Sequence, residues 1–126
     1  MTMNVYLASP YTHPSETEMA WRYFKALDLT ADLIERGWNV FSPIVHSHYI
    51  SKQTGIINSR FWVELDLSFL DRWADCLLVL CIPGYWQSDG VAREVDHART
   101  IGLSIVYTSD RGEFVMTKKI YGRMWE

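Results

Sequence analysis

Short apolar runs of strand length alternate along the chain with longer segments in which apolar residues recur every three or four positions. The runs lie at residues 4–8, 38–41, 76–82 and 103–107, and each predicts a strand. The helical spacing lies at residues 16–36, 60–73 and 91–101. The third run is apolar throughout, which is typical of a central strand covered on both faces. This alternation predicts an α/β chain built around a parallel sheet.

Residues between these segments predict where the elements begin and end. Ser15 is suited to cap the first helix and Gly37 to end it. Residues 44–59 show no sustained period, so we expect a long loop that lies like a lid over the carboxyl edge of the sheet. At the C-terminus, residues 113–116 predict a strand fragment followed by a short helix.

Length and patterning together predict a single domain over residues 1–126. The expected architecture is a flavodoxin-like three-layer fold with a parallel sheet of four to five strands, the first four in the order 2-1-3-4. In this order the first and third strands are neighbours, and the helices that follow them lie on opposite faces. The loops at residues 9–14 and 83–90 are therefore expected to flank a crevice.

Composition and charge narrow the range of partners. The net charge is -3, and no cluster of Lys or Arg gives the electrostatic footprint of a protein that binds polymeric nucleic acid or an anionic membrane. No apolar run reaches the roughly 18 residues of a spanning helix, and no basic segment precedes the first strand, so we expect a cytoplasmic protein. Cys76 and Cys81 lie inside the apolar run and resemble buried hydrophobic residues rather than a disulfide or a metal pair. The expected partner is a small molecule.

The crevice brings several reactive side chains into one neighbourhood. They are Tyr6, Ser9, Tyr11, Ser88, Asp89 and Glu94, and Asp66 joins them if its helix packs over the same edge. Glu94 follows a helix N-terminus, which favours an ionised carboxylate, and the Tyr6 hydroxyl is placed to orient it. Such a carboxylate can attack the anomeric carbon of a sugar while a second acid, Asp66 or Asp89, protonates the leaving group. The alternative is a helix acid paired with Arg93 or His97.

Three segments carry a resemblance to a known family. They are VYLASPY at residues 5–11, DL at 66–67 ahead of ADCLLV at 74–79, and SDGVARE at 88–94. Together they resemble the nucleoside 2-deoxyribosyltransferase superfamily, and more narrowly a small bacterial and phage branch of it. The resemblance implies that Glu94 is the nucleophile that takes the deoxyribosyl group, that Tyr6 orients it, and that Asp66 helps to place sugar and base. It also implies a flavodoxin-like fold and a homo-oligomer, a dimer or tetramer with sites near subunit interfaces.

The chain departs from the superfamily pattern at three places. Ser88 stands where transferases carry an acid, and the branch that hydrolyses deoxynucleoside 5′-monophosphates has a serine there that can bond phosphate. The first loop, however, lacks the Gly and Arg of that branch. In the superfamily, a Gly-x-Gly-x-Glu segment leads to the nucleophile. Here Gly90 is kept and Ala92 replaces the second glycine, so we expect the substrate to lie slightly further from the backbone. Hydrolysis is slightly favoured over transfer.

Three further questions are whether the chain holds a metal, which residues contact the ligand, and whether the protein is an enzyme. His46-Ser47-His48 with Asp66 has two histidines on one side of an extended segment but no third ligand at a defined spacing, so neither a metal nor another cofactor is expected. His46 or His48 is expected to cover the ligand. Trp86 is suited either to stack on a nucleobase or to pack against the lid or a second subunit. Two function classes remain open: an enzyme acting on deoxynucleosides or deoxynucleotides, and a non-catalytic module that binds a nucleotide derivative.

Overall fold

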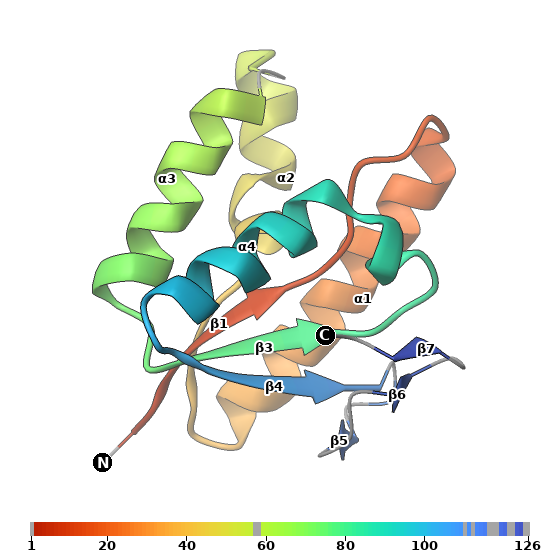
Figure 1. Cartoon of the computed structure of the whole chain (residues 1–126). Coiled ribbons are helices and arrows are strands. Elements are labelled where there is room, and N and C mark those ends of the chain that lie inside the picture. Colours follow the sequence, from red (N-terminus) through yellow and green to blue (C-terminus); the bar gives the residue numbers. More distant parts are fainter. Residues whose placement is uncertain are drawn as a thin grey trace.

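A computed structural model describes residues 2–56, 59–109, 111, 113–115, 119–120 and 123–124. Its elements are β1 (Asn4–Ala8), α1 (Glu16–Glu35), β2 (Asn39–Phe41), α2 (Pro43–Thr54), α3 (Ser59–Arg72), β3 (Cys76–Leu80), the short 3-10 helix η1 (Tyr85–Gln87), α4 (Asp89–Thr100), β4 (Ser104–Thr108), β5 (Phe114–Val115), β6 (Lys119–Ile120) and β7 (Arg123–Met124). Figure 1 shows α2 and α3 standing beside the sheet and α4 crossing it.

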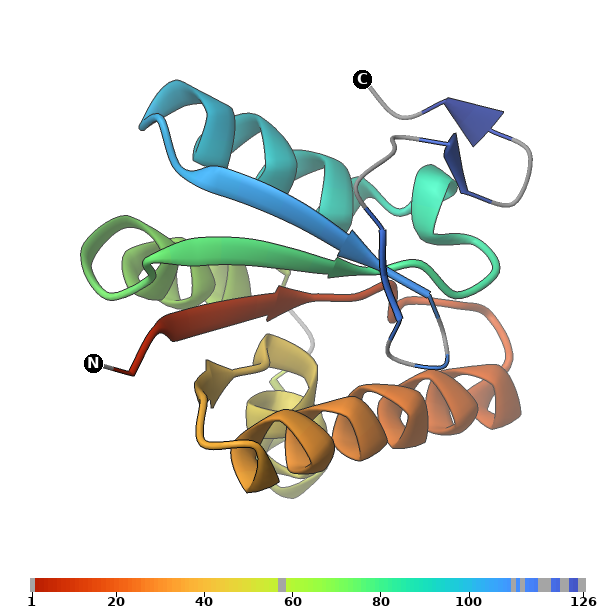
Figure 2. The same cartoon turned by 90° about the horizontal axis from the view of Figure 1, so that it is seen from below.

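The sheet has the predicted topology. Its strands lie in the order β2-β1-β3-β4-β5, the first four parallel and β5 antiparallel to β4. Helices cover both faces, and Figure 2 shows α1 and α4 on opposite sides of the sheet. The prediction of a flavodoxin-like three-layer α/β fold is confirmed.

Alternation along β1 divides its side chains between two cores. Val5 and Leu7 pack with the α1 residues Leu29 and Leu33, while Tyr6 and Ala8 pack into the core beneath α3 and α4. Successive side chains of a strand point to opposite faces, so this division follows directly from the sequence. Tyr6 is consequently directed toward α4.

The predicted lid at residues 44–59 is wrong over most of its length, because residues 43–54 form helix α2. Ser42 caps this helix by accepting a hydrogen bond from the Val45 N–H at 3.1 Å, and Pro43 occupies the first turn. Gly55 ends it with φ +74°, a left-handed conformation that glycine adopts without strain. The prediction also covered residues 57 and 58, which lie outside the described residues.

Other boundaries differ from prediction by a few residues. Helix α4 begins at Asp89 rather than at residue 91, because Ser88 caps it. The predicted strand fragment is present as β5, whereas the short C-terminal helix is wrong where the chain is described: β6 and β7 form an antiparallel pair. The Ser15 cap is confirmed by a 3.2 Å bond from the Glu18 N–H. Among the described residues, no helix combines the length and apolar character needed to cross a bilayer.

Candidate functional site

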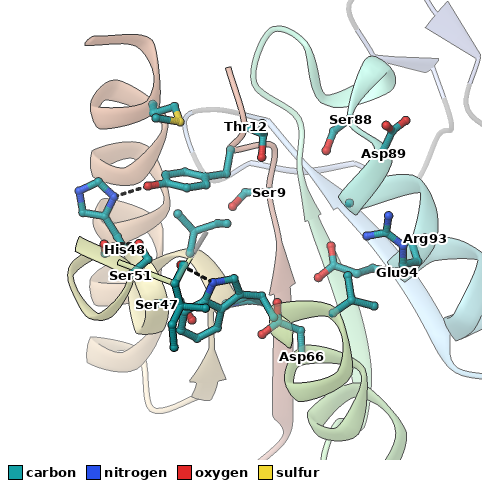
Figure 3. Close-up of a pocket in the computed structure, with 18 of the residues that line it drawn as sticks. Ser9, Thr12, Ser47, His48, Ser51, Asp66, Ser88, Asp89, Arg93 and Glu94 are labelled. Atoms are coloured by element: carbon teal, nitrogen blue, oxygen red, sulfur yellow. Dashed lines mark hydrogen bonds between the residues drawn. The ribbon is translucent and has the colours of Figure 1, made fainter. Parts of the chain in front are cut away.

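A pocket of about 760 Å³ lies beside the carboxyl ends of β1 and β3. The loop after β1, the helices α2 and α3, and the N-terminal half of α4 contribute its walls. Of the predicted site residues, it brings together Ser9, Tyr11, Asp66, Ser88, Asp89, Gly90 and Glu94. Figure 3 shows Asp66 and Glu94 coming from different helices toward the same space.

Tyr6 supports the pocket from beneath. It is fully buried, and its hydroxyl donates a hydrogen bond to Glu94 Oε2. Glu94 is the sixth residue of α4, and its side chain turns inward onto β1, where Tyr6 is placed by the strand alternation. The alternative pairing with His97 is not seen, since His97 contacts Asp71 at 3.3 Å and Glu94 is held by Tyr6, while the charge of Arg93 acts on Glu94 by lowering its pKa.

Burial controls the protonation of the two pocket carboxyl groups. It raises the pKa of Glu94 to about 8, an effect opposed by the Tyr6 hydrogen bond and reinforced by the charge of Asp66. It raises the pKa of Asp66 to about 7. Burial therefore opposes the ionised form of Glu94 that was expected from the helix N-terminus, because the residue lies in the second turn and is only 9% exposed. Burial also raises the pKa of Tyr6, which remains a donor.

Asp66 comes from α3, which packs over the same edge of the sheet as the sequence required. Its Oδ1 atom is buried and makes no hydrogen bond within the described part of the chain. An unpartnered buried carboxyl oxygen is costly in a folded protein unless a ligand or water completes it. Asp66 is thus available to a bound ligand.

The N-terminus of α4 forms one wall. Ser88 Oγ accepts a hydrogen bond from the Val91 N–H at 3.1 Å, so the serine caps the helix, while its own hydroxyl hydrogen remains available as a donor. Gly90 does not have a positive φ, and a β-carbon there would meet only Ser88 Oγ at 3.7 Å. Neither the backbone conformation nor the surrounding atoms therefore require glycine at position 90, which lines the pocket. Asp89 is exposed on the same turn.

The opposite wall contains a tyrosine held by a histidine. Tyr11 Oη lies 2.6 Å from His48 Nδ1, and the His48 ring stacks on Tyr23 at 4.1 Å. Burial lowers the pKa of His48, which favours the neutral ring and an acceptor role for Nδ1 toward the tyrosine hydroxyl. Close by, Ser9 is only 6% exposed, and its Oγ has no hydrogen-bond partner among the described residues.

Two predicted ligand contacts lie away from the pocket lining. His46 packs its ring against Phe41 at 5.6 Å, and Trp86 packs against the core beneath α4. The pair His46 and His48 no longer shares one side, because residues two apart on a helix face different directions. Within the described ranges, no three His, Cys, Asp or Glu side chains gather in a group that could hold a metal ion.

Sequence reasoning missed the pocket face of α2 and one residue of α4. Among the lining residues it did not select are Ser47, Ser51, Lys52 and Arg93. The three on α2 share a face with His48 at helical spacing, so recognising the helix from its Ser42-Pro43 start and Gly55 end would have grouped them. Lys52 and Arg93 are cations, and neither makes a salt bridge with another described residue.

Two comparisons with known proteins bear on the chain. A search of curated proteins finds no match. The resemblance to the nucleoside 2-deoxyribosyltransferase superfamily stays a prediction, because neither comparison tests it. A family model described as a domain of unknown function, DUF1937, matches residues 3–110, and the chain therefore belongs to this family.

Proposed function

We propose that this protein breaks the N-glycosidic bond of a deoxynucleoside or deoxynucleotide through a glycosyl intermediate on Glu94, with water as the favoured acceptor. The observation that carries the proposal is the hydrogen bond from the buried Tyr6 hydroxyl to Glu94, in a pocket that Asp66 also lines. Two carboxyl groups of different environment on one pocket are what this chemistry requires.

The reaction proceeds in two steps. A Glu94 carboxylate oxygen bonds to C1′ of the sugar, the bond between C1′ and the base nitrogen breaks with its electron pair on the base, and protonated Asp66 supplies a proton to the leaving base. Water then attacks C1′ while Asp66 accepts its proton. The ester bond breaks, releasing the sugar and restoring the Glu94 carboxylate.

The protonation of the pair suits this exchange between pH 7 and 8. With pKa values of about 7 for Asp66 and about 8 for Glu94, the two carboxyl groups together hold about one proton in this range. The reactive arrangement has that proton on Asp66 and leaves Glu94 ionised. Because the pKa of Glu94 is the higher of the two, this is the less populated arrangement of the singly protonated pair, and the effects of Tyr6 and Arg93, which lower the pKa of Glu94, keep it from being rarer still.

The polar groups beyond the carboxyl pair favour hydrolysis of a nucleotide. The Ser88 hydroxyl, the unpartnered Ser9 Oγ and the first N–H groups of α4 are donors for a phosphate. The first loop lacks an arginine, but Arg93 and Lys52 supply pocket cations from two helices. Deoxynucleoside monophosphates are therefore the substrates to test first.

The test measures release of free base by chromatography after incubation with a panel of deoxynucleosides and their 5′-monophosphates. Wild-type protein is expected to release base, and Glu94→Ala to abolish release because no nucleophile remains. Asp96→Asn, an exposed acid on the same helix that does not line the pocket, is the matched control and should retain activity. Release that persists in Glu94→Ala contradicts the mechanism.

A non-catalytic module that binds a nucleotide derivative is the second candidate. The observation that favours it is the raised pKa of Glu94, since a protonated carboxyl is a poor nucleophile. This candidate predicts binding of a monophosphate in calorimetry with no base released from any member of the panel. Base release by the wild type decides against it.

A further inference from the structure

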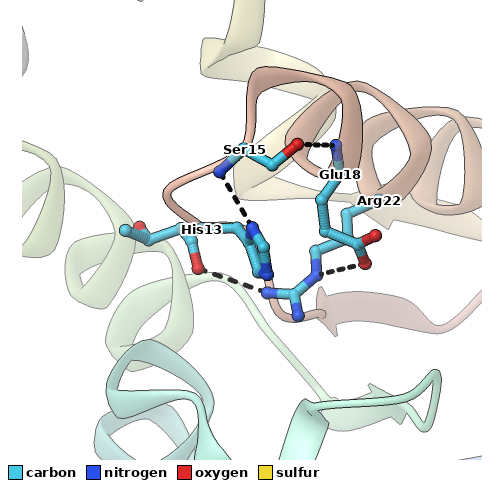
Figure 4. A network of polar contacts seen from close by, with 5 residues as sticks. His13, Ser15, Glu18 and Arg22 are labelled. Atoms are coloured by element: carbon cyan, nitrogen blue, oxygen red, sulfur yellow. Dashed lines mark hydrogen bonds and ion pairs between the residues drawn. The ribbon is translucent and has the colours of Figure 1, made fainter.

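Arg22 is a buried cation placed between the two loops that flank the pocket. It lies on α1 and is only 8% exposed. Its Nε donates to Glu18 Oε2 at 3.2 Å, as Figure 4 shows, and its Nη1 donates to the Thr12 carbonyl at 3.2 Å. Thr12 belongs to the loop after β1 and lines the pocket. The guanidinium thus ties that loop to α1.

The other side of the guanidinium contacts the loop after β3 at Gly84. A β-carbon at this position would stand 2.6 Å from Arg22 Nη2, closer than atoms approach without displacement. Gly84 also has φ +93°, a conformation that other residues rarely adopt. Position 84 is therefore shaped to receive the guanidinium in place of a side chain.

Backbone hydrogen bonds connect Gly84 to the N-terminus of α4, which lines the pocket. The Gly84 carbonyl accepts from the Gln87 N–H at 3.0 Å, and the Tyr85 carbonyl accepts from the Ser88 N–H at 3.3 Å. Ser88 then caps α4. A displacement at Gly84 is consequently carried along η1 to the helix N-terminus that lines the pocket.

We propose that Arg22 is a positioning residue that sets the spacing between the first-loop wall and the N-terminus of α4, and thereby the affinity of the pocket for its ligand. The geometry requires arginine rather than lysine. The planar guanidinium presents separate N–H groups to Glu18 and to Thr12 while a third nitrogen covers Gly84, whereas one ammonium cannot occupy all three places. The identity of the ligand, a deoxynucleotide, rests on the proposed function; the tie between the loops does not.

The first experiment compares amide hydrogen exchange in the ligand-free wild type, Arg22→Lys and Arg36→Lys. Arg36, the C-cap residue of α1, pairs with Asp32 at 2.6 Å with the same spacing of four residues, but both side chains are about half exposed, so it is a matched control. Arg22→Lys is expected to speed exchange roughly tenfold at residues 11–13 and 84–90 together, with strands β1 and β3 unchanged. Exchange at both loops equal to that of Arg36→Lys overturns the proposal.

The second experiment measures binding of deoxynucleoside 5′-monophosphates and, if base is released, kinetics. Arg22→Lys is expected to raise Kd or KM roughly tenfold through misplacement of the binding groups, with kcat close to wild type because the bond between Tyr6 and Glu94 is untouched. A fall in kcat with unchanged KM contradicts a positioning role. If even the wild type binds no nucleotide, the proposed function fails. The hydrogen-exchange experiment still tests whether Arg22 links the two loops.

A double-mutant cycle tests whether Gly84 acts through Arg22. Gly84→Ala places a methyl group where the guanidinium lies and also strains the backbone at φ +93°; Arg22→Lys relieves the clash but not the strain. The increase in loop exchange in the double variant is then expected to be smaller than the sum of the two single increases, with the strain as the remainder. Full additivity overturns the coupling. Should Arg22→Lys fail to fold, Glu18→Gln, which weakens the same anchor from a partly exposed position, replaces it in both experiments.

Discussion

The hydrogen bond between Tyr6 and Glu94 joins residues 88 positions apart in the sequence. Each residue has an ordinary local reason for its place: Tyr6 alternates inward on a strand, and Glu94 occupies the inner face of a helix. Burial at this place raises the pKa of Glu94, and the hydrogen bond from Tyr6 opposes that rise. The reactivity of Glu94 therefore depends on its surroundings more than on its residue type.

Removing the Tyr6 hydroxyl should change the pH dependence of the reaction. The hydrogen bond lowers the pKa of Glu94, so Tyr6→Phe is expected to raise it further and reduce the population with ionised Glu94 and protonated Asp66. We expect kcat/KM near pH 7 to fall roughly tenfold or more, and the upper edge of the bell-shaped profile to move to higher pH. Tyr49→Phe, an exposed tyrosine outside the pocket lining, is the control. An unchanged profile in Tyr6→Phe excludes this role.

The buried carboxyl of Glu94 should also cost stability at alkaline pH. Its pKa rises from 4.5 to about 8 in the folded protein, so the folded state retains a proton that the unfolded chain has lost in this range. The stabilisation from this retained proton is fully present below the unfolded pKa of 4.5 and is lost as the pH rises toward 8. Glu94→Gln, neutral at every pH, is expected to match the free energy of unfolding of the wild type at about pH 4 and to exceed it at alkaline pH by on the order of 2 kcal/mol.

Thermal unfolding across this pH range measures the difference. Asp96→Asn provides the exposed counterpart on the same helix. A stability difference between Glu94→Gln and wild type that is constant with pH would show that the proton is not retained on folding.

At the scale of elements, α2 and α4 show what local sequence signals can predict. The strands and α1 were placed to within a residue or two because their apolar periods are strong. The period of α2 is weak because one of its faces packs against α1 while another lines a polar pocket, so its end signals were interpreted as loop residues. The beginning of α4 was missed because Ser88 was considered for its ligand chemistry rather than as a cap.

The two roles of Ser88 can be separated by substitution. Ser88→Ala removes the cap and should cost about 1 kcal/mol, whereas Ser88→Asp keeps a capping oxygen and adds negative charge to the pocket. We expect Ser88→Asp to retain the wild-type Tm and to weaken the binding of monophosphates more than that of nucleosides. Ser15→Ala removes the equivalent cap of α1 outside the pocket lining, and should lower Tm without changing ligand affinity. An equal loss of affinity for monophosphates and for nucleosides in Ser88→Asp would argue against a phosphate contact at Ser88.

At the scale of the whole molecule, the strand order creates the pocket. Because β1 and β3 are neighbours whose following helices lie on opposite faces, their loops separate and leave a crevice at their carboxyl ends. The predicted order 2-1-3-4 was sufficient to place Ser9, Tyr11 and Ser88 together. It could not establish that α3 delivers Asp66 to the same space.

Self-association remains a prediction at this scale. Several large apolar side chains are exposed, including Phe24 at 52% and Tyr49 at 60%, and burying such groups between subunits would stabilise a small domain. We expect sedimentation analysis to give the mass of a dimer or tetramer that falls only on strong dilution. A monomer at all concentrations would contradict the expectation.

The sequence by itself determined the sheet order, the strand alternation that turns Tyr6 toward α4, and the identity of the residues at the crevice, since these follow from hydrophobic period and strand connectivity. Only the tertiary structure decided the protonation of Glu94 and Asp66, the choice of His48 over His46 at the pocket, and the place of Arg22 between two loops. Each of these depends on burial or on contacts between segments that are distant in the sequence. The spacing of neighbouring residues encodes neither burial nor such contacts.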